Sequence, residues 1–492
     1  MPELISVRAT PSPAAEPEPA AALRPLCVDL DGSLVKSDTL VDSLLALVRT
    51  HPALAFSLPG KLFEGKAAFK AFVTASVTLD AAHLPYNGVL LQFLRQEHAR
   101  GRAIYLATGA DEHLAHRVAD HLGIFTAVLA SDGTTNLTGS HKLDGLRQRF
   151  GSAPFDYIGN DTPDLPLLAA ATEAMVANPS LGLRMRLKAR GIRPAQCFQD
   201  RKPFLRSVIR AVRVQQWAKN LLIFMPLVLS HAITTAKLLI ALQAFFCFSL
   251  VASSAYLLND LLDIEADRGH ARKRLRPFAA GDLQGTTGVL IAALLLAVGM
   301  ARAQFLPVGF SAWLIIYLIT TVAYSLWLKR IALVDVLALS LLYILRLLAG
   351  SAATLTVISH WLAGFSMFLF LSLAIAKRFA ELENLRASNA VPRNGRGYLV
   401  NDLEQLRSFG TASAYAAVVV FAIYITGPDV AKLYHSPQLL LLSLPLMILW
   451  LNRVWLLASR GQLDEDPVAF ALTDGMSLLI GAAVLIVALL AL

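Results

Sequence analysis

The distribution of hydrophobic positions divides the 492-residue chain into two parts. Up to about residue 215, apolar residues form short runs separated by polar ones, as in a soluble globular domain. Beyond that point long apolar stretches dominate, and a transmembrane helix needs about 20 mostly apolar residues. We therefore predict a membrane region with nine spans. They cover approximately residues 218–233, 237–258, 286–304, 307–327, 332–351, 354–375, 411–427, 438–457 and 470–491.

The change from mixed to apolar sequence also sets the expected domain organisation. Residues 1–23 are rich in Pro, Ala and Glu and lack the basic start and apolar core of a signal peptide. We predict that they form a disordered lead-in. A soluble domain is expected at residues 24–200, followed by an all-α membrane domain at residues 201–492.

Composition supports a membrane protein. Hydrophobic residues make up 55% of the chain and charged residues only 16%, against about 25% charged in soluble domains. The net charge of +9 comes largely from Lys and Arg that flank apolar segments, which indicates a membrane rather than a nucleic-acid partner. Three widely spaced cysteines exclude a disulfide framework and a Cys-rich zinc site, and they fit a reducing cytosolic face.

Basic residues are unevenly shared between the loops that join the nine predicted spans. With the soluble domain in the cytosol, the inner loops carry most of them, whereas the outer loops carry little beyond Lys237 and Lys432. The inner loops are residues 259–284, 328–331, 376–410 and 458–469. This asymmetry predicts a multi-pass protein of the inner (cytoplasmic) membrane. An odd number of spans would place the C-terminus outside.

Acidic residues gather at the end of the second predicted span. At 100° per residue, Asn259, Asp263 and Asp267 form one stripe of a helix, with Asp260 beside it. Three carboxylates at a membrane interface repel one another unless cations lie between them. Mg²⁺ prefers carboxylate oxygens together with substrate phosphates. The stripe therefore predicts a Mg²⁺–diphosphate site.

Cations follow this stripe directly, at Arg272, Lys273 and Arg276. They suit a polyphosphate ligand, although a positive-inside anchor would also place cations here. The run Asn259-Asp260-x-x-Asp263-x-x-x-Asp267, followed by Arg276-Pro277-x-Ala279-x-Gly281, resembles the first motif of the UbiA superfamily of intramembrane prenyltransferases. The resemblance covers about residues 203 to 492. It implies nine helices and an Asp-rich helix that holds Mg²⁺ against the diphosphate of an isoprenoid donor.

The chain departs from the aromatic-substrate members of that superfamily after the sixth span. Those members carry a second Asp-x-x-x-Asp motif, where this chain has Lys377-Arg378-Phe379-Ala380-Glu381. Exchanging acids for cations implies fewer metal ions and more phosphate to bind directly. An i,i+4 salt bridge between Lys377 and Glu381 is the alternative explanation.

Further polar residues lie within or beside the predicted spans. Asp335 and Arg346 are eleven residues apart and share a helix face, as a substrate site or as a mutual pair. The other candidates for substrate binding are Arg213, Gln216, Lys219, Asn220, Tyr324 and Lys329. Together these segments resemble the subfamily typified by decaprenyl-phosphate phosphoribosyltransferase. The resemblance implies transfer of phosphoribose from phosphoribosyl diphosphate (PRPP) to a polyprenyl phosphate, over Mg²⁺ on Asp260, Asp263 and Asp267.

The soluble domain has its own candidate chemistry. A short apolar strand ends in Asp29-Leu30-Asp31-Gly32, where a carboxylate nucleophile has an acid two residues on. A second apolar strand ends in Thr108, and Lys142 and the segment 157–164 follow. This order resembles the four motifs of haloacid dehalogenase (HAD) phosphatases over about residues 24–200. It implies a Rossmann-like α/β domain with a helical cap at about residues 38–90.

The HAD resemblance implies a role for each motif. Asp29 would be the nucleophile and Asp31 the acid/base, while Thr108 and Lys142 would bind phosphate. Mg²⁺ would lie between Asp29 and the fourth motif. The candidate ligands are Asp29, Asp31, Asn160, Asp161 and Asp164. The first acid of the fourth motif falls on Asn160, so either Asp161 takes its place, Mg²⁺ binds weakly, or the domain is degenerate.

The fusion suggests a joint hypothesis, in which the membrane half makes a polyprenyl-phosphoryl 5-phosphoribose and the soluble half removes its 5-phosphate. The main alternative is a prenyltransferase that moves a prenyl group from a prenyl diphosphate to an aromatic or other small acceptor, with a degenerate HAD domain. A transporter is disfavoured because the polar residues gather at helix ends and no repeat is evident. The expected partners are Mg²⁺, a membrane lipid and PRPP or a small acceptor. The pattern leaves a homo-oligomer open.

Overall fold

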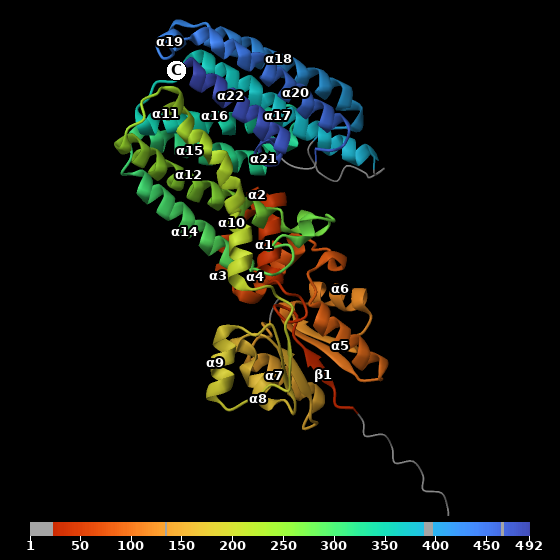
Figure 1. Cartoon of the computed structure of the whole chain (residues 1–492). Coiled ribbons are helices and arrows are strands. Elements are labelled where there is room, and N and C mark those ends of the chain that lie inside the picture. Colours follow the sequence, from red (N-terminus) through yellow and green to blue (C-terminus); the bar gives the residue numbers. More distant parts are fainter. Residues whose placement is uncertain (1–22, 133–134, 388–396, 464–466) are drawn as a thin grey trace, which may run out of the picture. The chain divides into compact units, whose positions relative to one another are not determined.

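The computed structural model describes residues 23–132, 135–387, 397–463 and 467–492. Two compact units make up the chain (Figure 1). One comprises Met1–Leu44 and Ala53–Arg201, and the other comprises Leu45–Pro52 and Lys202–Leu492. The predicted lead-in falls, apart from Leu23, outside the described residues, and so does part of the third predicted inner loop.

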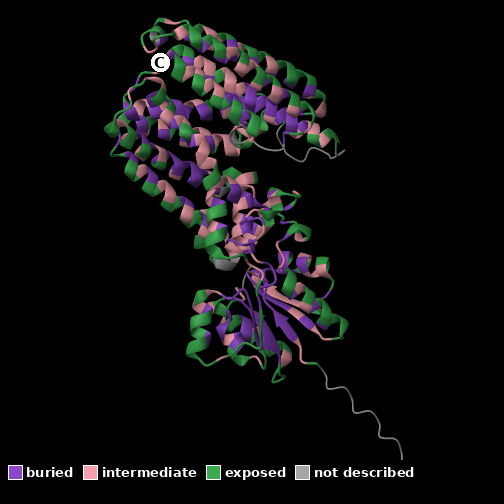
Figure 2. Cartoon of the chain, viewed as in Figure 1, coloured by how far each residue is buried: buried purple, intermediate pink, exposed green. Residues whose placement is uncertain are grey.

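The first unit is built on a six-stranded parallel sheet with the strand order β3-β2-β1-β4-β5-β6. The strands are β1 (Leu26–Val28), β2 (Ile104–Asp111), β3 (Ala127–Ser131), β4 (Asp156–Gly159), β5 (Ala174–Ala177) and β6 (Gln196–Phe198). The central strand β1 is fully buried, as expected for a parallel sheet covered on both faces (Figure 2). The strand order reverses between β1 and β4, and ligands of such sheets bind at the carboxyl ends of the strands there.

Helices follow the strands of this unit and form its cap. The helices that alternate with strands are α5 (Gly88–Ala99), α6 (Glu112–Leu122), α7 (Ser140–Phe150), α8 (Leu165–Ala170) and α9 (Leu181–Ala189). Between β1 and α5 the chain forms α1 (Thr39–Thr50), α2 (Pro52–Ala55), α3 (Leu58–Phe63), α4 (Lys66–Ser76) and the 3-10 turn η1 (Ala81–His83). The insertion is therefore helical, as the sequence predicted.

Within the described residues of the second unit, seven helices are long and apolar enough to cross a membrane. They are α12 (Thr235–Leu262), α14 (Gly285–Ala303), α15 (Val308–Leu326), α16 (Val334–Thr354), α17 (His360–Ala387), α18 (Leu403–Ile425, after the turn η6, Val400–Asp402) and α20 (Ser443–Ser459, after η7, Pro437–Leu442). The outward-facing apolar residues of α14, such as Leu290 and Leu294, are more than 60% exposed, as a lipid-facing surface requires.

The predicted count of nine spans is not confirmed. The first predicted span divides into a 3-10 helix, η3 (Val214–Phe224), and the short α11 (Met225–Leu229). The last, α22 (Gly475–Ala491), has 17 residues. The sixth predicted span also extends further than expected, because α17 continues to Ala387.

A glycine sets how closely the first and fifth predicted spans approach. A Cβ at Gly350 of α16 would lie 2.2 Å from the backbone oxygen of Ile223. Only glycine therefore lets η3 lie directly against α16, a small-residue contact typical of membrane helices. This contact brings the polar residues of η3 next to those of α16.

Candidate functional site

The acidic stripe of the second unit lies where α12 meets a short following helix, α13 (Ile264–Arg268). The prediction of one continuous helix is wrong, because α12 ends at Leu262 and Asp263 serves as its C-cap. The spacing nevertheless survives the break. The Asp263 amide donates to the Asn259 carbonyl at 3.0 Å, and the Asp267 amide donates to the Asp263 carbonyl at 2.8 Å. The polar stripe therefore keeps its one-turn intervals.

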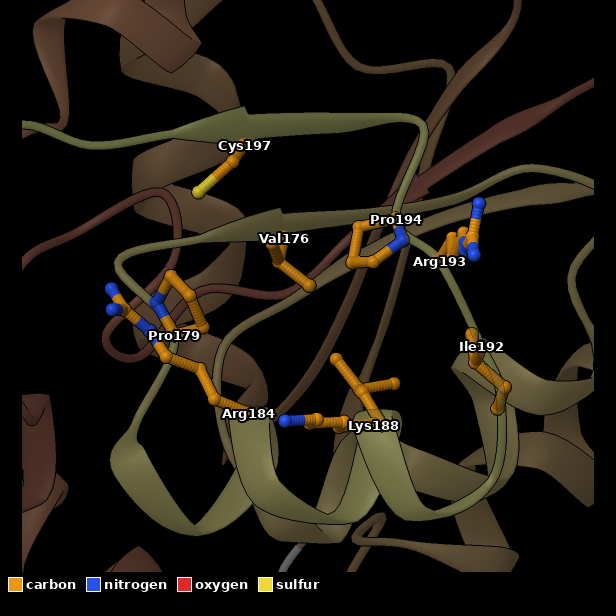
Figure 3. A pocket seen from close by; sticks show the side chains of 9 residues that line it. Val176, Pro179, Arg184, Lys188, Ile192, Arg193, Pro194 and Cys197 are labelled. Atoms are coloured by element: carbon orange, nitrogen blue, oxygen red, sulfur yellow. The ribbon is translucent and has the colours of Figure 1, made fainter.

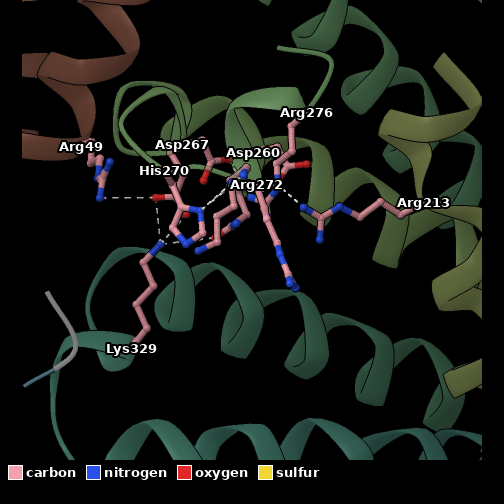
Figure 4. Close-up of polar contacts among 11 residues, drawn as sticks. Arg49, Arg213, Asp260, Asp267, His270, Arg272, Arg276 and Lys329 are labelled. Atoms are coloured by element: carbon pink, nitrogen blue, oxygen red, sulfur yellow. Dashed lines mark hydrogen bonds and ion pairs between the residues drawn. The ribbon is translucent and has the colours of Figure 1, made fainter. Parts of the chain in front are cut away.

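Guanidinium groups join two of these acids (Figure 4). Arg276 Nη1 lies 3.1 Å from Asp260 Oδ1 and 2.7 Å from Asp267 Oδ2. Arg213 Nη2 donates to the same Asp260 oxygen at 2.5 Å. The backbone of Arg213 adopts the left-handed conformation, with φ 56° and ψ 50°, which is uncommon for a residue other than glycine. Two arginines thus converge on Asp260.

Asp263, which lies between Asp260 and Asp267 in the chain, has different partners. Lys329 Nζ lies 2.9 Å from Asp263 Oδ2 and 3.4 Å from the side-chain oxygen of Asn259. Arg49, in the part of α1 that belongs to this unit, lies 3.6 Å from Asp263. Sequence reasoning did not identify Arg49, because only the tertiary fold brings a residue of the cap helix to this site.

Burial shapes the electrostatics at the end of the stripe. It raises the pKa of Asp267 to about 6, while the Arg276 guanidinium opposes that rise. His270, which the sequence analysis also missed, accepts the backbone amides of Arg272 and Lys273. Burial and the neighbouring cations lower the pKa of His270. The arrangement concentrates carboxylates and cations in one small region.

A metal at this site would need ligands beyond the protein. Within the described residues, no three His, Cys, Asp or Glu side chains form a ligand group by themselves. Mg²⁺ commonly takes one or two carboxylates together with waters and substrate phosphates. Asp260 and Asp267 suit such a shared site, because both reach one guanidinium nitrogen and both are buried.

The replacement for the second acidic motif lies on α17 and faces a neighbouring helix. Arg378 Nε donates to the buried Asp335 of α16 at 2.5 Å, and Tyr398 donates to the same carboxylate. Arg378 also donates to Glu381 at 2.7 Å and to the Tyr324 hydroxyl at 2.9 Å. Arg378, the residue after Lys377, is thus held by two carboxylates and a tyrosine hydroxyl.

Of the two alternatives for Asp335 and Arg346, the mutual pair is not formed, because Asp335 bonds to Arg378 instead. Arg346 is buried on α16, where it donates to the Asn220 side chain at 2.8 Å and to the Tyr317 hydroxyl at 3.4 Å. Lys219 and Arg346 lie 5.6 and 5.4 Å from the centre of the Tyr343 ring. The structure therefore gathers Lys219, Asn220 and Arg346, with Gln216 half-buried on the same 3-10 helix.

In the first unit, a buried lysine connects two motifs. Lys142 Nζ lies 2.7 Å from Asp29 Oδ1 and 3.3 Å from Asp164 Oδ1. The Tyr157 hydroxyl donates to that Asp164 oxygen at 2.8 Å. Asp31, which follows β1 in the same turn as Asp29, accepts the Thr39 amide. Burial raises the pKa of both Asp29 and Asp31 to about 7, with Lys142 opposing the shift at Asp29.

The fourth motif separates into inward and outward residues. Asn160 is buried at the end of β4, and a Cβ on Gly32 would lie 2.0 Å from its side-chain nitrogen. Asn160 therefore reaches the turn that carries Asp31. The Asp161 carboxylate instead accepts the Thr162 amide and the Ser180 hydroxyl, both at 2.7 Å. It is not placed as the substitute ligand that the sequence suggested.

Thr108 lies on the neighbouring strand β2, where it is buried and accepts the Ala110 amide at 3.0 Å. A separate cavity of about 390 Å³ lies between α9 and β6 (Figure 3). Its lining includes Arg184, Lys188 and Cys197. None of the predicted site residues lines it, so it is distinct from the Asp29 site.

Comparison with known proteins identifies the membrane unit. Residues 221–478, more than half of the chain, match the UbiA prenyltransferase family. The chain belongs to the UbiA prenyltransferase family. It is therefore a multi-pass membrane transferase by family.

Two relatives of this UbiA protein cover different extents of it. An uncharacterized protein of Sinorhizobium fredii, y4nM, is 35% identical over 466 residues, which is 93% of this chain and 89% of the relative. The decaprenyl-phosphate phosphoribosyltransferase of Mycobacterium tuberculosis is 33% identical over 222 residues, which is 44% of this chain and 73% of the relative. The UbiA part is thus related to phosphoribosyltransferases.

The first unit has HAD-like neighbours among solved structures. One is a HAD family hydrolase of Salmonella enterica serovar Typhi, which is 16% identical and covers 35% of this chain and 67% of its own, with a TM-score of 0.26. So distant a likeness assigns no role to any residue of this unit.

Proposed function

We propose that the membrane unit transfers 5-phosphoribose from PRPP to a polyprenyl phosphate, with loss of diphosphate. The observation that carries this proposal is the number of cations around the acidic stripe. Arg213, Arg276 and Lys329 all lie within 3.1 Å of one of its carboxylates. A prenyl diphosphate brings a single diphosphate group, whereas PRPP and a lipid phosphate together bring two more phosphates. The extra cations match the extra phosphates.

A second observation supports a phosphate-rich substrate pair. Where aromatic prenyltransferases carry a second acidic motif, this chain places Arg378, held by the buried Asp335 and by Tyr324. An arginine fixed on two sides presents its charge in a defined orientation. The relation to decaprenyl-phosphate phosphoribosyltransferase agrees with this assignment.

The acids and cations of the site take separate roles in the proposed reaction. Asp260, Asp263 and Asp267 would hold Mg²⁺, which supplies charge neutralisation for a departing diphosphate. Arg276 and Arg213 both contact Asp260. There, a guanidinium group can donate two parallel hydrogen bonds to a phosphate. The C1–diphosphate bond breaks as the lipid phosphate oxygen bonds to C1. That oxygen is already anionic, so no general base is required.

For the first unit, we propose hydrolysis of the 5-phosphate from the lipid-linked product. Asp29 attacks phosphorus and Asp31 protonates the departing 5-hydroxyl oxygen, after which water hydrolyses the aspartyl phosphate. The buried Lys142 supports this role, because it contacts Asp29 at 2.7 Å and leaves a positive charge beside the incoming phosphate. Asn160, Asp29 and Asp164 would hold Mg²⁺, with an amide oxygen in place of one carboxylate.

One experiment separates the proposal from its main alternative. Purified protein would be incubated with Mg²⁺ and either radiolabelled PRPP plus polyprenyl phosphate or radiolabelled geranylgeranyl diphosphate plus aromatic acceptors. We expect label in the lipid fraction only with PRPP. Transfer from the prenyl diphosphate alone would instead establish an aromatic prenyltransferase. The observation that favours this alternative is Asn160, because an amide in place of the usual carboxylate is what a degenerate HAD domain would carry.

The topology of the chain is a further part of the proposal. We propose that the protein lies in the inner membrane, with the acidic stripe and the first unit on the cytosolic side and the C-terminus on the outer side. Cys197, which is exposed in the first unit, provides the test. A membrane-impermeant maleimide should label Cys197 in inside-out vesicles and not in intact spheroplasts. The reverse result would invert the proposed orientation.

A further inference from the structure

The cap of the first unit exposes large apolar side chains at one place. We call residues 53–63, which include α3 and most of α2, the cap tip (Figure 1). Phe56 and Phe63 are 89% and 92% exposed, and Leu62 is 56% exposed. Helix α3 has no buried residue. Soluble proteins seldom leave two aromatic side chains so completely in water within eight residues.

The start of the cap tip is tied to the membrane unit. Leu45–Pro52 belongs to that unit, and Leu45 packs against a cluster that includes Leu257 and Leu261 of α12. These are the last turns of a membrane-spanning helix. Phe56 follows Pro52 by four residues, and a fully extended chain spans at most about 3.3–3.6 Å per residue. Phe56 is therefore within about 15 Å of Pro52, however the two units are oriented.

The chemistry of the cap tip fits the boundary between lipid headgroups and acyl chains. Aromatic side chains are favoured at that depth, whereas charged groups remain at the surface. Lys61 is the cation of the cap tip, and its ammonium group lies 2.8 Å from Glu64 and 5.7 Å from the centre of the Phe72 ring. The tip thus combines exposed aromatic residues with a neutralised charged pair.

We propose that the cap tip inserts Phe56 and Phe63 into the surface of the bilayer that α12 crosses. The proposal commits to phospholipid as the occupant of this surface, because the tip continues directly from a segment packed at the end of that helix. The insertion would hold the Asp29 site beside the membrane, where a lipid-linked phosphate ester is presented. This last consequence rests on the proposed phosphatase function, whereas the insertion itself does not.

Depth-dependent fluorescence quenching tests the insertion without any enzymatic activity. Full-length protein with Cys197→Ser in nanodiscs would carry Phe56→Cys or Phe63→Cys, labelled with an environment-sensitive fluorophore. The matched controls are Leu181→Cys and Met185→Cys on α9, which are 77% and 68% exposed in the same unit. Nitroxide-bearing lipids should quench the cap-tip labels at least about twofold more than the control labels. Equal quenching, as a contact with a second copy of the chain would give, overturns the proposal.

A pair of substrates then tests the consequence for catalysis. Phe56→Ser with Phe63→Ser should lower hydrolysis of a phosphate ester on a polyprenyl lipid by about tenfold and leave hydrolysis of p-nitrophenyl phosphate unchanged. Leu181→Ser with Met185→Ser should change neither rate. Equal loss on both substrates would show damage to the Asp29 site and overturn the delivery role. Wild-type protein that hydrolyses neither substrate would remove the phosphatase proposal, while the quenching result would still decide whether the tip inserts.

Discussion

The two candidate sites hold their carboxylates in opposite ways. In the first unit, one lysine on α7 contacts both Asp29, just after β1, and Asp164, on the 3-10 turn after β4, and all three side chains are buried. In the membrane unit, cations from separate segments contact the acidic stripe through long side chains that are partly exposed. A rigid short-range cluster suits transfer of a single phosphate. Several independent cations suit a substrate pair with several phosphates.

The largest effect expected from this comparison is at the rigid site. Asp29→Asn removes the nucleophile, and we expect phosphate release to fall by at least about 10³-fold, while transfer to lipid continues. Phosphate release and lipid labelling would be measured in one reaction mixture. Asp161→Asn is the matched control, because its carboxylate bonds to Thr162 and Ser180 and not to Asp29. Loss of transfer together with hydrolysis would contradict the independence of the two sites.

The acidic stripe should show the next largest effect. Asp263→Ala or Asp267→Ala should lower transfer from PRPP by about 10²–10³-fold, because each removes a carboxylate that is proposed to hold Mg²⁺ and that also contacts a cation of the site. Glu265→Ala serves as the control, since that residue lies between them in sequence and outside the stripe. Transfer at the wild-type rate in both Asp variants on every donor tested would remove the catalytic assignment of the stripe.

The cations of the membrane site should be more replaceable than the lysine of the first unit. Arg276→Lys keeps the positive charge but loses the bidentate contact that a guanidinium makes with a phosphate. We therefore expect the KM for PRPP to rise by about tenfold with a smaller change in kcat. Lys142→Arg has no comparable space, because Lys142 is buried between Asp29, Tyr157 and Asp164. It should abolish phosphate release. Tolerance at Lys142 and intolerance at Arg276 would reverse the comparison.

The sequence predicted the stripe well because helical spacing depends on local hydrogen bonds. The carbonyls of Asn259 and Asp263 keep their helical partners even though α12 breaks between them. The break itself had no signal, since neither glycine nor proline lies at Leu262 or Asp263. Local patterns therefore gave the motif and missed the end of the helix.

Long-range pairing was much harder to predict. Asp335 bonds to Arg378, which is 43 residues away in the chain. Arg346 carries the same charge as Arg378 and lies on the same helix as Asp335, yet it is not the partner. Only the packing of α16 against α17 decides between the two arginines. In the first unit, the spacing of the fourth motif predicted candidate ligands at Asn160, Asp161 and Asp164. It carried no information on which of them faces Asp29, because a single backbone turn directs Asp161 to Ser180.

The smallest expected effect concerns pH and stability at the rigid site. Burial raises the pKa of Asp31 to about 7 in the folded unit, from an ordinary value of 3.8. The folded state therefore binds this proton more tightly than the unfolded state, and the resulting stability is lost as pH rises from about 4 to about 7. Asp31→Asn removes that loss, so the variant should gain on wild type between pH 5 and pH 8. We expect a gain of about 1 kcal/mol, discounted because Asp31 is only half-buried. Hydrogen exchange of the β1 and β4 amides in the full chain would measure the stability of the variant and of wild type at pH 5 and at pH 8. A stability difference between the two proteins that is the same at pH 5 and at pH 8 would show that Asp31 is not held protonated by burial.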